Sequence, residues 1–149
     1  MLVREVMVKQ VRSAKPGDSV RSVAGIICTN RISGLPVVDD DNNLIGLISE
    51  KDILNTLLPS YSDFLEDPIG ARDFVAMEKS YSEILSKDVA SLMTRKLFTV
   101  GPDDPVMKAA SQMAIHNFRR IPVVDKGKLV GVLSLGDIHK AIFQRELDK

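Results

Sequence analysis

Two serine–aspartate pairs are the residues of this 149-residue chain whose types and spacing could do chemistry. Ser49 precedes Asp52 by three positions, and Ser134 precedes Asp137 by the same spacing. A carboxylate offers two acceptor oxygens to the hydroxyl groups of a ligand, and a serine at a helix N-terminus offers donors to phosphate. The same Ser-x-x-Asp pattern is also close to a capping box, which needs no ligand. The spacing therefore leaves ligand binding and helix capping as alternatives.

Arg119 and Arg120 form a second candidate group. Adjacent guanidinium groups supply many fixed donors, which suits them to phosphate oxygens. The alternative is a solvated pair on a loop. The matching positions earlier in the chain, Ser33 and Gly34, are small and uncharged, so two sites built on this pattern would be unequal.

The remaining residue types form no catalytic or metal-binding constellation. His116 and His139 are far apart in the sequence and lack a cysteine or carboxylate at ligand spacing, so we expect them to be exposed helix residues. No nucleophile elbow or Gly-rich loop organises the Ser, His and Asp residues. We expect no catalytic residue, no metal site and no required cofactor.

Composition narrows the function classes. The 20 basic and 20 acidic residues cancel, and nucleic-acid binding would need a basic excess. No apolar run approaches the ~18 residues of a membrane span. The single cysteine, Cys28, cannot form an internal disulfide, and no signal segment opens the chain. We therefore expect a cytoplasmic location and neither a nucleic-acid nor a membrane partner.

The candidate residues are positioned by a unit that occurs twice. Pro36-Val37-Val38-Asp39 recurs as Pro122-Val123-Val124-Asp125, an offset of 86 residues (122 − 36), and one deletion in the following turn shifts the rest of the second repeat. A fixed period indicates two copies of one supersecondary unit. Each repeat spans only ~55 residues, which is marginal for a core of its own. We expect the two repeats to share a core.

Each repeat is predicted to be a strand, a helix, two strands and a helix. Apolar residues at helical spacing predict helices over residues 20–28 and 106–114, and Cys28 falls on the apolar stripe. Asp104 is expected to cap the second of these helices. The predicted strands cover 11–14, 35–38 and 44–49, then 97–100, 121–124 and 129–133. The last helix of the first repeat begins at Glu50 with Ile53, Leu54, Leu57 and Leu58 inward, and its partner carries Ile138, Ala141 and Ile142.

A segment between the repeats has no counterpart. Residues 74–85 carry apolar side chains at helical spacing and predict one amphipathic helix. This segment is either a helical connector packed on the core, or a lid over a ligand or part of a subunit interface. The predicted boundaries are 1–58 for the first repeat, 59–87 for the insert and 88–149 for the second repeat.

The ordered set of motifs, found twice, resembles a tandem pair of cystathionine-β-synthase (CBS) domains, also called a Bateman module. The resemblance rests on Gly34-Leu35-Pro36-Val37-Val38-Asp39, on Arg120-Ile121-Pro122-Val123-Val124-Asp125, and on the Gly-x-x-Ser and Ser-x-x-Asp segments that follow each. It covers nearly the whole chain except the insert. It implies an α/β (α+β) fold in which two β-α-β-β-α repeats pack about a pseudo-twofold axis, with two clefts between them.

The resemblance also implies a function. Such clefts commonly bind adenosine-containing ligands, namely AMP, ADP or ATP, and sometimes S-adenosylmethionine or a cyclic dinucleotide. The aspartate of Ser-x-x-Asp accepts hydrogen bonds from the ribose hydroxyls, and basic residues at the positions of Arg119 and Arg120 meet the phosphate. Family members regulate rather than catalyse, and they pair into homodimers that act on a partner protein.

Two clefts can be assembled from the resemblance. The first, cleft A, takes Val11, Arg12, Ile32, Ser33, Gly34, Pro36, Arg119, Arg120, Ser134 and Asp137. The second, cleft B, takes Leu97, Phe98, Thr99, Phe118, Pro122, Ser49, Asp52 and Arg31. Cleft A ranks first because it holds the arginine pair. Arg12 departs from the small or apolar residue expected there, and it either adds a phosphate contact or blocks the adenine pocket.

The sequence thus predicts a nucleotide-sensing regulatory module. The alternative from a different class is a ligand-free structural or protein-interaction module with degenerate clefts. Intact Ser-x-x-Asp pairs favour binding, whereas the missing base at Ser33 and Gly34 favours a degenerate cleft B.

Overall fold

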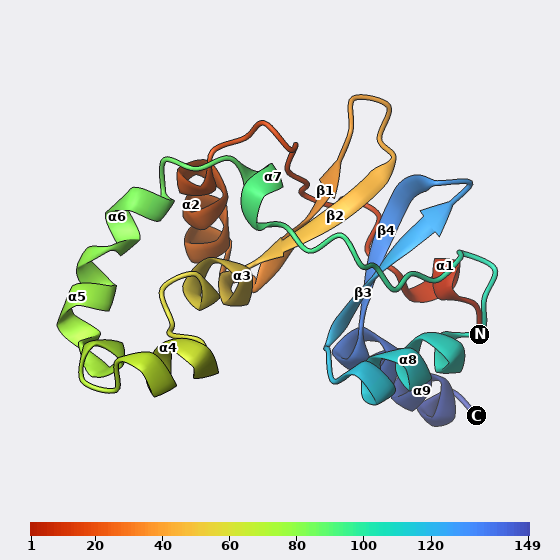
Figure 1. Ribbon diagram of the computed structural model, residues 1–149. Coiled ribbons are helices and arrows are strands. Elements are labelled where there is room, and N and C mark those ends of the chain that lie inside the picture. Colours follow the sequence, from red (N-terminus) through yellow and green to blue (C-terminus); the bar gives the residue numbers. More distant parts are fainter. The chain divides into compact units, whose positions relative to one another are not determined.

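The computed structural model describes all 149 residues, which form two spatial units of mixed α/β structure (Figure 1). Unit 1 consists of Met1–Arg12, Val38–Leu44 and Lys96–Lys149, and unit 2 of Ser13–Val37 and Ile45–Arg95. Each contains strands and helices, which confirms the predicted fold class. The predicted boundaries along the sequence stay a prediction.

Unit 1 is built on the antiparallel hairpin of β3 (Arg120–Asp125) and β4 (Lys128–Ser134). Two residues with positive φ, Lys126 (51°) and Gly127 (84°), make the tight turn between them, as a two-residue hairpin loop requires. Helices α8 (Val106–His116) and α9 (Leu135–Leu147) pack against each other and against this hairpin (Figure 1).

Unit 2 has the same plan. The other two-stranded sheet consists of β1 (Gly34–Val38) and β2 (Leu44–Ser49). Helices α2 (Val20–Asn30) and α3 (Glu50–Asn55) pack against each other. The insert follows as a chain of short helices: α4 (Tyr61–Glu66), the 3₁₀ helix η1 (Gly70–Arg72), α5 (Phe74–Lys79) and α6 (Tyr81–Ile84).

The buried apolar residues form two clusters, one in each unit, so the expectation of a single shared core is wrong. Met113, Ile121 and Leu133 are fully buried in unit 1, and Ile48 and Val37 are fully buried in unit 2. Each cluster is completed by a residue of the short helix that precedes the other repeat.

The short helices α1 (Val3–Val6) and α7 (Val89–Leu92) each precede one repeat but pack with the other. Val3 is fully buried in the core of unit 1, and its N–H donates to the carbonyl of Asp104 at 2.8 Å. Val89 is fully buried in unit 2, and its N–H donates to the carbonyl of Asp18 at 2.8 Å. The repeats therefore exchange their leading segments.

The predicted strands 11–14 and 97–100 are wrong, because each segment makes only one parallel bridge. The Val100 N–H donates to the Pro122 carbonyl at 3.2 Å, and the Val124 N–H donates to the Val100 carbonyl at 2.9 Å. The next bonds on either side would need an N–H from Pro122 or Pro102, and proline has none. In the first repeat the bridge joins Ala14 to Val37, and the prolines are Pro36 and Pro16.

Two side-chain expectations are also corrected. Cys28 is exposed rather than buried, because at about 100° per residue it lies about 107° from the mean direction of Val20, Val23 and Ile27. Asp104 caps no helix. Its carboxylate accepts instead from the Gly101 N–H and from Lys108, and these bonds hold its pKa below the ordinary value.

The last helix of the first repeat is shorter than its apolar spacing predicts. α3 ends at Asn55, so Leu54 and Leu58 stay 50% and 56% exposed, while Ile53 is buried. The amphipathic helix predicted over 74–85 is likewise broken into α5 and α6 at Ser80, whose hydroxyl donates to the Ala76 carbonyl at 3.0 Å. Such back-bonding bends helices.

The longest helix, α9, has 13 residues. None of the helices combines the length and the apolar composition that crossing a membrane requires.

Candidate functional site

The start of α9 brings together four predicted site residues in unit 1. Ser134 is the N-cap, and its hydroxyl oxygen accepts from the Asp137 N–H at 3.0 Å. Arg120 lies opposite Ser134 in the register of β3 and β4. The carbonyl of Arg119 accepts from the Leu135 N–H at 3.0 Å. The hairpin therefore holds both arginines beside the first turn of a 13-residue helix, whose N-terminus favours anions.

The charged groups at this helix start are not used within the protein. The carboxylate of Asp137 accepts no hydrogen bond, and the residue is half-buried. Arg119 and Arg120 are exposed and form no ion pair. One carboxylate and two guanidinium groups are thus free to meet a ligand that carries both hydroxyl groups and an anion.

The equivalent pair in unit 2 is used for helix capping. The Ser49 N–H and hydroxyl both donate to Asp52 Oδ2, at 2.9 and 3.0 Å, and the Asp52 N–H donates to Ser49 Oγ at 3.1 Å. This is a complete capping box. The Thr94 hydroxyl donates to the remaining oxygen, Asp52 Oδ1, at 2.9 Å. Both oxygens of Asp52 therefore have a partner before any ligand arrives.

Thr94 is the residue that sequence reasoning missed. It bridges to Leu47 of β2, and the residue in the corresponding place of the other repeat is Val8, which bridges to Val132 of β4. Valine has no hydroxyl to donate, so nothing plays the part of Thr94 beside Asp137. An alignment of the two repeats could have revealed this difference, because it pairs Thr94 with Val8 at the same offset of 86 residues (94 − 8) as the other matched positions.

Close packing explains why the first repeat has no base next to its serine. A Cβ atom added at Gly34 would lie 2.7 Å from the Ile48 carbonyl oxygen and 3.0 Å from the Ser49 Cα atom. A side chain at that position would require the backbone to move. The Ser33 carbonyl accepts from the Glu50 N–H at 2.9 Å, as the Arg119 carbonyl does for Leu135. The two repeats therefore share this backbone hydrogen bond but differ in the side chains beside it.

Three aromatic rings gather in unit 1. The Phe98 and His116 rings stack with centroids 3.8 Å apart, and His116 lies nearly parallel to Phe118 at 5.5 Å. The Lys96 ammonium lies 6.0 Å from the Phe98 centroid. The prediction that His116 is an exposed helix residue is confirmed, but its stacking was not foreseen. The counterparts in the first repeat, Arg12, Asn30 and Ile32, carry no ring.

The other predicted residues are distributed over both units. Val11, Ile32, Leu97 and Thr99 are half-buried, Pro36 and Pro122 are buried, and Arg12, Arg31 and Ser33 are exposed. Arg31 ends α2 in the left-handed conformation, with φ 53°. Clefts A and B each take residues from both units, so the clefts themselves stay predictions.

No group of three or more His, Cys, Asp or Glu side chains is arranged to hold a metal ion.

Comparison with known proteins identifies the family of the chain. The CBS domain family model matches residues 3–59 and 87–144. Over 95% of its length the chain is 34% identical to the uncharacterized protein MJ1426 of Methanocaldococcus jannaschii, 91% of which is covered. It is 33% identical to the chloroplastic CBS domain-containing protein CBSX1 of Arabidopsis thaliana and spans 64% of that protein's length.

Solved structures of CBS domain pairs have the same fold. The structure of CBSX2 in complex with AMP superposes with a TM-score of 0.74 at 30% identity, covering 97% of this chain and 98% of that one. The CBS domain pair of protein MJ0100, in complex with 5′-methylthioadenosine and S-adenosyl-L-methionine, gives 0.69 at 25% identity, with 97% and 98% covered. The chain belongs to the CBS domain family and contains two CBS repeats.

Proposed function

We propose that this protein is a regulatory module that binds an adenosine-containing nucleotide at the start of α9. Asp137 accepts hydrogen bonds from the ribose hydroxyls, and Arg119 and Arg120 bind the phosphate. The observation that carries the proposal is the free carboxylate of Asp137 at a helix start that the backbone places next to Arg119 and Arg120, neither of which forms an ion pair. A nucleotide supplies the vicinal diol and the anion that this set of groups lacks.

Two further observations support an adenosine ligand. CBSX2 binds AMP, and MJ0100 binds 5′-methylthioadenosine and S-adenosyl-L-methionine. Both complexes contain the adenosine group, whereas only AMP carries phosphate. The arginine pair favours a phosphorylated ligand, that is AMP, ADP or ATP.

The alternative of a ligand-free structural module is favoured by one observation, which concerns the other repeat. Both oxygens of Asp52 already accept hydrogen bonds, one from Ser49 and the other from Thr94. We infer that the Asp52 pair serves the stability of its repeat, so that cleft B is the weaker site or is empty.

Calorimetric titration with AMP, ADP, ATP, S-adenosylmethionine and adenosine tests the proposal. Arg120→Ala should weaken the binding of AMP and ATP and leave adenosine unaffected, because Arg120 meets only the phosphate. Arg145→Ala, an exposed arginine near the other end of α9, is the control and should change neither. The absence of heat and of any thermal stabilisation by the whole panel at millimolar concentration would favour the ligand-free module.

We further propose that the protein acts as a homodimer on an unidentified partner and is not an enzyme. Closed twofold pairing is the commonest oligomeric form, and α8 and α9 expose large apolar side chains: Met107, Ile115, Phe143 and Leu147. A monomeric mass by light scattering at micromolar concentration would contradict the dimer. The cytoplasmic location stays an expectation from the single cysteine.

A further inference from the structure

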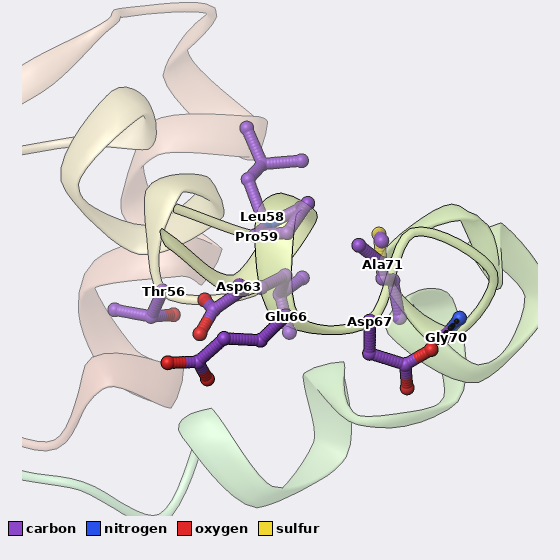
Figure 2. Close-up of a pocket in the computed structure, with 10 residues that line it drawn as sticks. Thr56, Leu58, Pro59, Asp63, Glu66, Asp67, Gly70 and Ala71 are labelled. Atoms are coloured by element: carbon purple, nitrogen blue, oxygen red, sulfur yellow. Dashed lines mark hydrogen bonds between the residues drawn. The ribbon is translucent and has the colours of Figure 1, made fainter. Parts of the chain in front are cut away.

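The insert of unit 2 holds a pocket that plays no part in the proposed nucleotide site. The pocket has a volume of about 430 Å³ and lies between the end of α3 and helices α4, η1 and α5 (Figure 2). Its apolar wall consists of Leu57, Leu58, Pro59, Ala71 and Met77. Leu57 packs on the core of unit 2, whereas Leu58 is 56% exposed. The apolar wall is therefore held by the core of unit 2 at Leu57 and accessible to a partner at Leu58.

The insert that holds this pocket exposes many large apolar side chains. Five large apolar side chains of the insert are more than 60% exposed: Tyr61, Leu65, Ile69, Phe74 and Val75. Burying a large apolar side chain stabilises by ~1.5–3 kcal/mol relative to leaving it in water, and exposed patches of this kind mark interaction sites. The insert thus has the composition of a surface that docks onto another molecule.

Three carboxylates line the other side of the pocket. Asp63 and Glu66 lie three residues apart on one face of α4, and Asp67 follows as the C-cap residue of that helix. Figure 2 shows the carboxylates of Asp63 and Glu66 pointing the same way, toward Thr56, with Asp67 turned toward Gly70. No base lines the pocket. The acidic side of the pocket has no counter-charge within the protein.

These carboxylates keep most of their acceptor capacity. Glu66 accepts no hydrogen bond, and Asp67 accepts one, from the Gly70 N–H at 3.0 Å. Asp63 completes the capping box of α4 by accepting from the Ser60 N–H at 2.9 Å, and this bond holds its pKa below the ordinary value. The nearest base in the sequence, Arg72, lies over the Phe64 ring at 4.9 Å instead.

The charge of the insert indicates which kind of partner this surface can bind. The insert, residues 59–87, carries six acidic and three basic residues, in a chain whose total charge is zero. Two inserts facing each other would bring like charges together, and an anionic lipid surface would repel the insert. A segment with apolar residues and Lys or Arg matches both the apolar wall and the acidic side, because the methylene stem of such a side chain packs on apolar surface while its head meets carboxylates.

We propose that the insert pocket is the docking site for a basic amphipathic segment of a partner protein, with one Lys or Arg side chain entering between Leu58 and Glu66. This binding needs no nucleotide, so it stands or fails separately from the proposed function. It gives the insert a role that the two CBS repeats do not supply, namely contact with the regulated protein.

The test uses the full chain and two synthetic peptides. One is an amphipathic helix of Leu and Lys, and the other is a neutral control peptide with Gln in place of each Lys. Fluorescence anisotropy should show tighter binding of the Leu/Lys peptide. Amide shifts in nuclear magnetic resonance spectra should move at Thr56, Ala71 and Met77. Glu66→Gln should weaken binding about two- to fivefold, the effect of losing one exposed ion pair, and adding Leu58→Ser should weaken it further.

Glu78→Gln is the matched control. Glu78 is an exposed glutamate of the same insert that accepts no hydrogen bond and does not line the pocket, so it should change binding by less than twofold. Equal effects of Glu66→Gln and Glu78→Gln, or shifts away from the pocket, would overturn the proposal. So would insert-dependent binding to phosphatidylserine vesicles in place of the peptide, or self-association that Glu66→Gln strengthens.

Discussion

The two Ser-x-x-Asp pairs have the same sequence pattern and the same place in their repeats, but they do different work. In unit 2 both oxygens of Asp52 accept hydrogen bonds from Ser49 and Thr94. In unit 1 the carboxylate of Asp137 accepts none, although Ser134 still caps the helix. One motif therefore stabilises a helix in one repeat and leaves a free carboxylate in the other.

The difference is set by neighbours rather than by the motif. Thr94 supplies a hydroxyl where the other repeat has Val8, and Arg120 occupies the strand position that close packing reserves for Gly34. A capped aspartate must lose hydrogen bonds before it can bind ribose, whereas a free one loses only its contact with water. Duplicated motifs should accordingly be judged by what already contacts their polar atoms.

The short helices α1 and α7 provide a second comparison between the two units. Among the substitutions, Val3→Ala in α1 is expected to lower the stability most. Val3 precedes the first repeat but is buried in unit 1, so its truncation should lower the free energy of unfolding by about 2 kcal/mol. Hydrogen exchange should accelerate in β3 and β4. The matched substitution Val89→Ala should act on β1 and β2. Faster exchange of β1 and β2 in Val3→Ala, with β3 and β4 unchanged, would break the comparison.

A smaller effect separates the two aspartates in the ligand-free protein. Asp52→Ala removes the capping box and the Thr94 bond and should cost about 1 kcal/mol of stability. Asp137→Ala removes only a charge in the first turn of α9 and should cost no more than about 0.5 kcal/mol. Urea denaturation of both variants measures the difference. Equal losses would mean that Asp137 has a structural role like that of Asp52.

Much of the fold could be predicted from the sequence, because the repeat fixed the order of the elements and apolar spacing fixed their types. β2 was predicted at its observed bounds, and the other three strands within one residue at either end. The bridging segments at Ala14 and Val100 could not be placed as single bridges without knowing which prolines face them. The packing of α1 and α7 in the core of the opposite repeat leaves no local pattern in the sequence, so it could not be predicted.

The residue types of the candidate site could be predicted from the sequence. Whether their polar atoms already form hydrogen bonds within the protein could not. Ser134, Asp137, Arg119 and Arg120 follow from the motif and the repeat, and the hairpin brings them together. One of the two oxygens of Asp52 is occupied by Thr94, a residue 42 positions away in the sequence. Only the comparison of Thr94 with Val8 across the repeat carried the information about that bond in the sequence.

The most direct test of the account is calorimetric titration of AMP into the wild-type protein, Asp137→Ala and Asp52→Ala. Losing a carboxylate that accepts two ribose hydroxyls should cost roughly 1.5–3 kcal/mol, so Asp137→Ala should weaken AMP about 10- to 150-fold. Asp52→Ala should leave the affinity within twofold. Retained affinity in Asp137→Ala together with a loss in Asp52→Ala would contradict the account and assign nucleotide binding to the other repeat.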